Sequence, residues 1–360
     1  MQKNEKIKIL IVGCGNMGAS HAKVYHRLNN DFEICGLVSR GESKHILNKA
    51  LQANYPVFDS YEKALEQSNP DAVCISTYPD THLEYTLAAF NAGCDVFLEK
   101  PIATTAKGAK ELVKAAERTG RKLVIGYILR QHPCWQKFIE VAQGLGKPLV
   151  MRMNLNQQSH GYMWDVHKNL MKSLSPIVDC GVHYIDVMCQ MVRSKPKQVS
   201  AIGARLTDEI SPDNYNYGQL QIIFEDGSIG WYEAGWGPMI SETAHFVKDV
   251  MGPKGSVSIV SASAMEQGTT DAVDRHTKTE SLKIHHAALD TTNEFEKEDQ
   301  WIHFKDEPDH LELCMREQLY FLDAIRNDID LSVHLQDAVS SLEVVLACDE
   351  SVKSGKTVYL

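Results

Sequence analysis

The sequence predicts an α/β protein with two domains. An N-terminal doubly wound parallel sheet is expected to precede an α+β domain that has a large, mostly antiparallel, open-faced sheet. The chain of 360 residues is too long for one ordinary core. Short apolar runs alternate with helical patterns over the first part of the chain, and alternating polar and apolar segments follow. We expect the domains to cover 1–126 and 127–360, with C-terminal helices able to pack back on the first.

The first domain is predicted from continuous apolar runs with helices between them. Such runs are typical of parallel strands that are buried on both faces. The intervening segments 82–92 and 106–119 are predicted helices. The predicted strands are 8–13, 33–39, 71–77, 95–100 and 122–127.

The second domain is predicted from period-two alternation and one turn dipeptide. Asp226-Gly227 lies between two alternating segments, which is a strong hairpin signal. Residues 261–305 are polar and have no clear pattern. The predicted strands are 198–206, 218–227, 228–236, 255–260 and 356–360, and the predicted helices are 175–188, 311–327 and 335–353.

Composition limits the classes of partner and compartment. A net charge of −10 argues against nucleic acid and anionic membranes, both of which reward a basic face. The nine cysteines form no C-x-x-C pair, which favours a reducing compartment. The polar start has no signal-peptide pattern, and no apolar run approaches the roughly 20 residues that cross a bilayer. We therefore expect a cytoplasmic protein.

A glycine turn follows the first predicted strand. Gly13-Cys14-Gly15-Asn16-Met17-Gly18 opens a helix directly after the buried-strand pattern. In this context Gly13 permits a tight turn, Gly15 lets the backbone approach a pyrophosphate, and Gly18 allows close helix–strand packing. The amides at the helix start, at Asn16 and Met17, then face the anion. The spacing predicts a dinucleotide site of the Rossmann type, and a purely structural glycine turn is the alternative.

The end of the second predicted strand bears on which dinucleotide is bound. Ser39 and Arg40 stand where an NAD site usually has an acidic residue for the ribose. An arginine beside a small hydroxyl suits a 2′-phosphate, which favours NADP over NAD. Alternatively Arg40 is a solvated loop residue, and Glu42 or the backbone serves the ribose.

A lysine precedes a proline at the end of the fifth predicted strand. Glu99 and Lys100 lie where open parallel sheets bind ligands, and Pro101 keeps Lys100 out of helical backbone space. Its ammonium is therefore expected to point into the crevice. An ordinary surface lysine is the alternative.

One later helix carries three ionisable groups on one side. Asp179, His183 and Asp186 lie at i, i+4 and i+7 within an otherwise apolar helix. An imidazole with a near-neutral pKa can take the proton of a substrate hydroxyl as hydride leaves. A buried histidine satisfied by a local carboxylate is the alternative.

The ordered motifs resemble one family. The glycine turn, "TYPDTH", "EKP", "GYILRQHP" and "DCGVHYID" are similar, in order, to the glucose–fructose oxidoreductase / inositol dehydrogenase / MocA-like family. The C-terminal 40 residues also resemble the end of such proteins, so the resemblance covers essentially the whole chain. It implies an NAD(P)-dependent oxidoreductase that transfers hydride between nicotinamide and a secondary alcohol or ketone of a sugar, polyol or inositol-like substrate.

The resemblance also implies roles for individual residues. Lys100 takes the place of the catalytic lysine, and Asp179 and His183 take the D-x-G-x-H positions that face the nicotinamide. Which of Lys100 and His183 is the final base stays open. Gly181 is expected to keep the helix face open. The resemblance also places near cofactor or substrate the residues Thr77, Tyr78, His82, Glu99, Tyr127 and Arg130, although His82 could equally be an ordinary residue at a helix start. Independently of the resemblance, Trp164, Asp165 and His167 are expected on a loop, where an aromatic beside a carboxylate and an imidazole suits a polyhydroxylated ring. Ordinary surface-loop composition is the alternative.

Departures and alternatives remain. Relatives carry glycines before the D-x-G-x-H motif, where this chain has Ser175-Pro176. We expect no metal, because the histidines lack ligand spacing. We expect a homodimer or homotetramer, with Trp231 and Trp236 on the open sheet face. An NAD-dependent glycosidase that uses a transient oxidation, and a non-catalytic dinucleotide-binding regulator, are the alternative functions.

Overall fold

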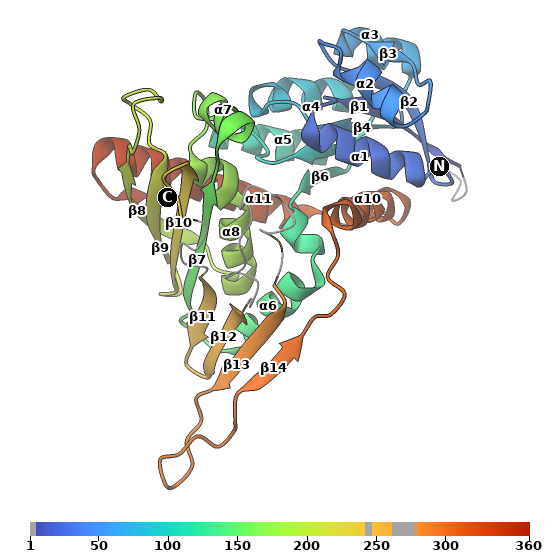
Figure 1. The fold of residues 1–360 in the computed structure, drawn as a ribbon. Coiled ribbons are helices and arrows are strands. Elements are labelled where there is room, and N and C mark those ends of the chain that lie inside the picture. Colours follow the sequence, from blue (N-terminus) through green and yellow to red (C-terminus); the bar gives the residue numbers. More distant parts are fainter. Residues whose placement is uncertain (1–4, 242–246, 261–276, 278) are drawn as a thin grey trace. The chain divides into compact units, whose positions relative to one another are not determined.

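A computed structural model describes residues 5–241, 247–260, 277 and 279–360 of the chain (Figure 1). The chain forms two compact units. The first contains residues 1–128 and 310–339, and the second contains residues 129–309 and 340–360. Helix α11 (Ser332–Ser354) begins in the first unit and continues into the second.

The first unit is built on a six-stranded sheet with the order β3-β2-β1-β4-β5-β6. Every strand pair in this sheet is parallel, so the predicted doubly wound sheet is confirmed. The sequence did not predict β3, because a strand of two residues is too short to show a period. The strands are β1 (Ile7–Val12), β2 (Phe32–Val38), β3 (Val57–Phe58), β4 (Ala72–Ile75), β5 (Asp95–Glu99) and β6 (Leu123–Gly126).

Helices connect these strands, and their ends follow local capping chemistry. The helix predicted over 106–119 is α5 (Ala106–Thr119), which begins where the Thr105 side chain accepts from the Gly108 amide. It ends at Gly120, whose φ of +64° is left-handed. The other helices are α1 (Asn16–Arg27), α2 (Ser43–Ala50), α3 (Tyr61–Ser68), α4 (His82–Asn91), α10 (His310–Arg326) and the short η1 (Pro79–Thr81).

The second unit is built on a nine-stranded sheet with the order β14-β13-β12-β11-β7-β10-β9-β8-β15. The β7–β10 pair is parallel and the other pairs are antiparallel, which confirms a mostly antiparallel sheet. The strands are β7 (Val150–Gln158), β8 (Pro196–Ala204), β9 (Tyr217–Phe224), β10 (Ile229–Gly237), β11 (Lys248–Gly252), β12 (Gly255–Val260), β13 (Ser281–His286), β14 (Gln300–His303) and β15 (Val358–Tyr359).

The hairpin predicted at Asp226-Gly227 is confirmed. Strands β9 and β10 pair across it, and Gly227 has a φ of +82°. A second hairpin, β13–β14, lies where the sequence has no pattern. All four residues of β14 are exposed or only partly buried, so burial imposes no period-two alternation on that strand.

Helices cover one face of the second sheet. Helix α8 (Pro176–Val192) packs on β10, and α6 (Pro133–Gly144) packs on β12. Helix α7 (Gly161–Leu170) and the short η2 (Ile128–Gln131) complete the unit. Within the described ranges, no helix combines the length and the apolar character needed to cross a bilayer.

The expectation that Trp231 and Trp236 share the open face is wrong. The two residues are five positions apart on β10, and side chains an odd number of residues apart point to opposite faces of a regular strand. Trp236 is 0% exposed and stacks on His167, whereas Trp231 is partly exposed.

Candidate functional site

The glycine turn has the geometry of a dinucleotide-binding loop. Gly13 has a φ of +92°, and a Cβ placed on it would lie 2.5 Å from the Ser76 carbonyl oxygen. A Cβ on Gly18 would lie 1.8 Å from the Gly13 carbonyl oxygen, so only glycine lets α1 approach the turn. No atom lies within 4 Å of a Cβ placed on Gly15, which leaves open space for an anion at the α1 start. Asn16 and Met17 form the first turn of that helix.

A buried lysine organises the loop after β2. Ser39 and Arg40 follow the strand directly, and Arg40 is exposed. The Lys44 ammonium donates to the Ser39 and Gly41 carbonyl oxygens at 3.0 and 2.8 Å, and it lies 2.7 Å from an Asp59 carboxylate oxygen. Sequence reasoning missed Lys44, which lies in the first turn of α2, because a lysine in a polar stretch of sequence carries no sign of burial.

His82 ties together two loops at the carboxyl edge of the sheet. Its Nδ1 lies 2.8 Å from the Pro101 carbonyl oxygen, and its Nε2 lies 3.1 Å from that of Thr77. Burial lowers the pKa of His82, and the two carbonyl oxygens oppose that shift. Both ring nitrogens of His82 therefore contact backbone carbonyl oxygens, one in each of the two loops. Tyr78, by contrast, is exposed.

Glu99 and Lys100 lie at the carboxyl end of β5. The Glu99 side chain is buried, and its Oε2 accepts from the Lys100 amide at 3.2 Å. Lys100 is only partly buried, and the Lys100–Pro101 peptide bond is cis. The first unit thus gathers the glycine turn, the loops after β2 and β4, and Lys100 at one edge of its sheet, where open α/β sheets bind ligands.

A chain of buried hydrogen bonds lies behind Glu99. The Gln318 amide nitrogen lies 3.0 Å from Nδ1 of His21, and Nε2 of His21 lies 2.7 Å from Oε1 of Glu99. The Tyr25 hydroxyl donates to the Gln318 amide oxygen. An amide nitrogen can only donate, so Nδ1 of His21 accepts and the ring proton lies on Nε2, which donates to Glu99. Neutral His21 therefore fixes the Glu99 carboxylate.

Glu317 lies beside this chain and is 3% exposed. Neither carboxyl oxygen has a hydrogen-bond partner among the described residues. Burial, and then the nearby charge of Glu99, raise the Glu317 pKa well above its usual value. Ligand atoms of His21, Cys314 and Glu317 lie within 4.8 Å of one another, and these are donor types that zinc accepts. Both nitrogens of His21 are already in hydrogen bonds, however, so the arrangement suits a protonated Glu317 carboxyl group better than a metal ion.

In the second unit, helix α8 presents two groups toward accessible space. Of residues 176–189, all of which the structure describes, only Asp179 and His183 are not fully buried. Ser175 begins the helix by accepting from the Val178 amide at 3.1 Å, and Pro176 occupies the first turn. The Ser175-Pro176 departure from relatives therefore serves as a helix cap.

The role expected for Gly181 is wrong. A Cβ on this residue would lie 2.9 Å from a ring carbon of Tyr232 on β10. The glycine therefore lets α8 pack closely on the sheet, and it does not open the side of the helix that carries Asp179 and His183.

Arg130 and Asp186 form a buried ion pair. The Arg130 guanidinium donates from Nε and a terminal nitrogen to the two Asp186 oxygens at 2.8 and 2.5 Å. Gln190 donates to the same carboxylate at 2.9 Å. Asp186 thus braces α8 against the segment that carries Arg130. Tyr127 belongs to the first unit and is buried.

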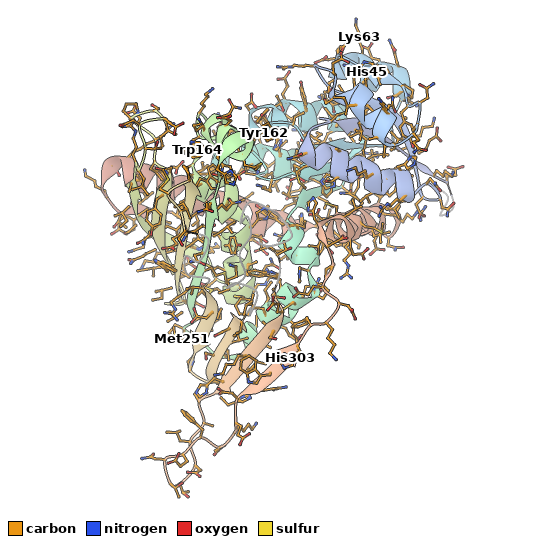
Figure 2. The ribbon with its side chains drawn as sticks, viewed as in Figure 1. His45, Lys63, Tyr162, Trp164, Met251 and His303 are labelled. Atoms are coloured by element: carbon orange, nitrogen blue, oxygen red, sulfur yellow. The ribbon has the colours of Figure 1, made fainter. Side chains whose placement is uncertain are left out.

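Trp164 and Asp165 lie on helix α7, so the loop expected there is wrong (Figure 2). Trp164 is 6% exposed and packs in a cluster with Met171, Cys180, Ile210 and Trp236. Its indole nitrogen donates to Glu209 at 3.2 Å. Asp165 is exposed and lies 3.0 Å from the Lys168 ammonium.

Sequence reasoning missed Gln157 and Tyr162 in the second unit, and it placed His167 on a loop, whereas His167 lies on α7. The Gln157 amide oxygen accepts from the Trp236 indole at 2.7 Å, and His167 Nδ1 lies 2.9 Å from the Ser159 hydroxyl oxygen. Tyr162, on the first turn of α7, is 76% exposed (Figure 2). The sequence feature that could have indicated Tyr162 is an aromatic residue at the start of the helix.

Curated relatives are dehydrogenases of polyols and sugars. Inositol 2-dehydrogenase of Paracoccus denitrificans is 29% identical over 188 residues, which span 51% of this chain and only 53% of that protein. Inositol 2-dehydrogenase of Acidothermus cellulolyticus is 23% identical, over 72% of this chain and 75% of its own length. D-glucoside 3-dehydrogenase of Escherichia coli is 25% identical, over 71% and 78%.

Solved structures share the fold along the whole chain. Scyllo-inositol dehydrogenase from Lactobacillus casei, with bound NAD(H) and scyllo-inositol, has a TM-score of 0.75 at 20% identity and 99% coverage of both chains. An oxidoreductase from Thermotoga maritima has a TM-score of 0.77 at 22% identity, covering 99% of this chain and 98% of its own.

Two family profiles match most of the chain. Residues 7–127 match the oxidoreductase family with an NAD-binding Rossmann fold, and residues 140–360 match the C-terminal alpha/beta domain of that family. The resemblance inferred from the ordered motifs is confirmed. The chain belongs to the NAD-binding oxidoreductase family named for glucose–fructose oxidoreductase, inositol dehydrogenase and MocA.

Proposed function

We propose that this protein is a nicotinamide-dependent oxidoreductase that interconverts a secondary alcohol and a ketone on a sugar, polyol or inositol-like substrate. The proposal rests on two features of one family fold, one in each unit. The first unit has a glycine turn with open space at Gly15 and a lysine at the carboxyl end of β5. In the second unit Asp179 and His183 are the α8 side chains that reach the surface over 176–189.

The residues at the sheet edge fit a dinucleotide. The α1 amides, with no side chain at Gly15 in the way, suit a pyrophosphate, and the loop after β4, at Thr77 and Tyr78, suits the remainder of the cofactor. A bound nicotinamide would accept or supply the hydride. Nε2 of His21 lies 2.7 Å from Oε1 of Glu99 and holds that side chain in place, next to Lys100 in the chain.

The proton chemistry is assigned to Lys100 and His183. Oxidation of an alcohol leaves a carbonyl only if the hydroxyl proton also departs, and a neutral imidazole or amine can receive it. We propose that both groups face the reacting carbon, with the Lys100 ammonium stabilising charge on the substrate oxygen. Asp179, one turn before His183, would hold the imidazole or a neighbouring hydroxyl.

We further propose that NADP is used in preference to NAD. Ser39 and exposed Arg40 follow β2 directly, and Lys44 adds a second cation to that loop. The family as a whole is described as NAD-binding, so the preference rests on these residues alone. The ratio of kcat/KM for NADP+ to that for NAD+ should exceed one in the wild type and fall at least about tenfold in Arg40→Ala.

Substrate contacts are proposed from the second unit. Polyhydroxylated rings need several hydrogen-bonding groups beside an aromatic face. Asp165 is exposed, and Arg130 is close enough to Asp186 that it would act mainly by positioning. Trp164 offers little free ring surface, so we place the aromatic contact on its exposed neighbour Tyr162, and Tyr127 at the border with the cofactor.

The test is a panel of sugars, polyols and inositols with NAD+ and NADP+, read at the absorbance of reduced nicotinamide. Lys100→Ala and His183→Ala should each lower kcat by at least about a hundredfold while cofactor affinity, measured by fluorescence titration, changes little. Lys63→Ala and His303→Ala, both exposed, are the matched controls. Wild-type rates in both active-site variants would refute the mechanism. A cofactor that survives gel filtration together with glycoside cleavage would instead indicate the glycosidase.

We also propose a reducing, cytoplasmic setting and a homo-oligomer. All nine cysteines are free, and eight are buried. Denatured, unreduced protein should therefore titrate nine thiols. The open sheet face carries the partly exposed apolar side chains Ile223, Ile229 and Met251, which support a dimer or tetramer measurable by light scattering.

A further inference from the structure

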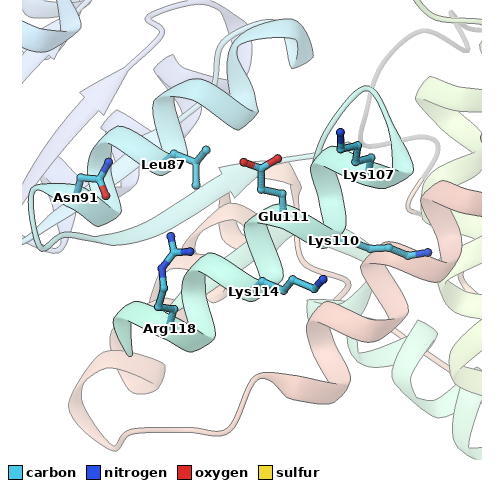
Figure 3. Close-up of a pocket in the computed structure, with 7 residues that line it drawn as sticks. All are labelled: Leu87, Asn91, Lys107, Lys110, Glu111, Lys114 and Arg118. Carbon is cyan, nitrogen blue, oxygen red and sulfur yellow. The ribbon is translucent and has the colours of Figure 1, made fainter.

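A basic groove lies on the outer side of the first unit. It is a cavity of about 640 Å³ between α4 and α5. Figure 3 shows its basic side chains projecting from successive turns of α5, with Leu87 and Asn91 contributed by α4. The residues that line it are Leu87, Asn91, Lys107, Lys110, Glu111, Lys114 and Arg118. We call it the α5 groove.

The charge of this groove is opposite to that of the chain. Four lining residues are basic and one, Glu111, is acidic, although the protein carries a net charge of −10. Lys107, Lys114 and Arg118 form no ion pair with any residue that the structure describes. Their exposed ammonium and guanidinium groups therefore create a local positive potential that attracts an anionic partner.

The second unit carries an acidic projection. Residues 287–299 join β13 to β14, and we call them the hairpin arm; in Figure 1 this segment extends beyond the ends of the two strands. Every residue from 288 to 301 is exposed. The arm is nevertheless ordered by backbone bonds, since the Asp290 amide donates to the Glu294 carbonyl at 2.8 Å and the Glu296 amide to the Ala288 carbonyl at 3.0 Å.

Three carboxylates of the arm are available to a partner. Asp290 accepts from amides of its own turn, and Asp299 pairs with Lys283 and His285. Glu294, Glu296 and Glu298 form no ion pair among the described residues and recur at every second position. Exposed carboxylates without internal partners lose little when they pair with cations elsewhere.

The lengths of the two charge rows agree. Lys114 and Arg118 are spaced four residues apart on a helix, which is about 6 Å along its axis. Glu294 and Glu296 are separated by at most about 7 Å of chain. Two neighbouring carboxylates can therefore lie along two neighbouring cations without a gap. Leu87 gives the groove an apolar part, and Phe295, which is 57% exposed although its ring packs edge-on against His285, gives the arm an apolar side chain.

We propose that the hairpin arm of one copy of this chain docks in the α5 groove of a second copy. The complementarity of charge, the matching length and the presence of both surfaces in every copy favour another copy over a foreign anion. The arm of each copy meets the groove of the other, so two such contacts related by a twofold axis form one isologous interface and would close a dimer. It is independent of the proposed chemistry, since no residue of the sheet edge or of α8 takes part.

Two triple variants test the contact. The arm variant carries Glu294→Lys, Glu296→Lys and Glu298→Lys, and the groove variant carries Lys107→Glu, Lys114→Glu and Arg118→Glu. Each variant alone places like charges at the contact, so each should weaken self-association at least about tenfold. Mass is measured by size exclusion with light scattering at 0.05 M and 1 M salt, where charge screening differs strongly.

Mixing the two variants distinguishes the proposal from its rivals. The arm variant keeps a basic groove, and the groove variant keeps an acidic arm, so the mixture has complementary surfaces on both sides and should regain the wild-type mass at low salt. Recovery only when all six substitutions share one chain would show a contact within a chain and overturn the proposal. Unchanged mass in either single variant would overturn it as well.

A matched control distinguishes the effect of a changed net charge from the effect of losing the contact. Lys23→Glu, Lys49→Glu and Lys63→Glu change the charge of the first unit equally at exposed positions outside the groove. This variant should keep the wild-type mass. Dehydrogenase activity is not a readout of this test, so loss of the proposed function and loss of the contact are recognised separately.

Discussion

Glu317 provides a test of the buried hydrogen-bond network beside Glu99, next to Lys100 in the chain. Its carboxyl group is buried beside Glu99, has no hydrogen-bond partner among the described residues, and has a pKa raised well above 4.5. The folded protein therefore holds a proton that the unfolded chain releases above about pH 4.5. The perturbation is Glu317→Gln, which keeps the shape of the protonated acid and cannot titrate.

The size of the effect follows from proton linkage. Where the folded state binds one more proton than the unfolded state, the free energy of unfolding falls by about 1.4 kcal/mol for each rise of one pH unit. This contribution is fully present below the unfolded pKa and is lost as pH rises toward the folded pKa. As pH rises from 5 toward the raised pKa of the folded carboxyl group, the unfolding free energy of the wild type should fall relative to that of Glu317→Gln, by up to about 1.4 kcal/mol for each pH unit.

The assay is urea unfolding of both proteins at pH 5, 6 and 7, followed by tyrosine absorbance and circular dichroism. The quantity compared is the difference in unfolding free energy between wild type and Glu317→Gln at each pH. A cost of burying the amide is the same at every pH, so it does not affect how this difference changes with pH. Glu312→Gln, on an exposed position of the same helix, is the control for removal of a carboxylate. A difference between wild type and Glu317→Gln that stays constant from pH 5 to pH 7 would refute the interpretation that Glu317 keeps a proton in the folded protein.

Three further substitutions test the packing around the site. Gly18→Ala places a Cβ against the carbonyl of the glycine turn and should lower the melting temperature and weaken cofactor binding at least about tenfold, measured by fluorescence titration; unchanged affinity would contradict the role of the turn. Asp186→Asn leaves Arg130 without its buried counter-charge and should lower the unfolding free energy by about 3 to 5 kcal/mol in denaturant titrations. Gly181→Ala should cost about 1 to 3 kcal/mol through its clash with Tyr232 while cofactor affinity stays the same; loss of affinity without loss of stability would restore an open-face role.

The sequence determined the parts of this protein that depend on local pattern. Buried parallel strands must be apolar throughout, so five of the six strands of the first sheet were visible as continuous runs. The glycine turn could be predicted because each position requires glycine for its own steric reason. Gly13 has a left-handed φ, and Gly18 lies close to the Gly13 carbonyl oxygen. The period of α8 placed Asp179 and His183 on one side, and these are the side chains that stay accessible.

Tertiary structure decided everything that depends on partners distant in sequence. Gly181 faces Tyr232, Trp236 is buried against His167, and Asp186 pairs with Arg130, and none of these contacts leaves a mark in a local pattern. His21 and Glu317 are nearly 300 residues apart, yet both are buried beside Glu99. The spacing of apolar residues in the sequence shows which side of a helix or strand is apolar. It does not show which residues will pack against that side. The hydrogen bonds and the pKa of a buried group depend on those neighbours, so they are set only when the chain has packed.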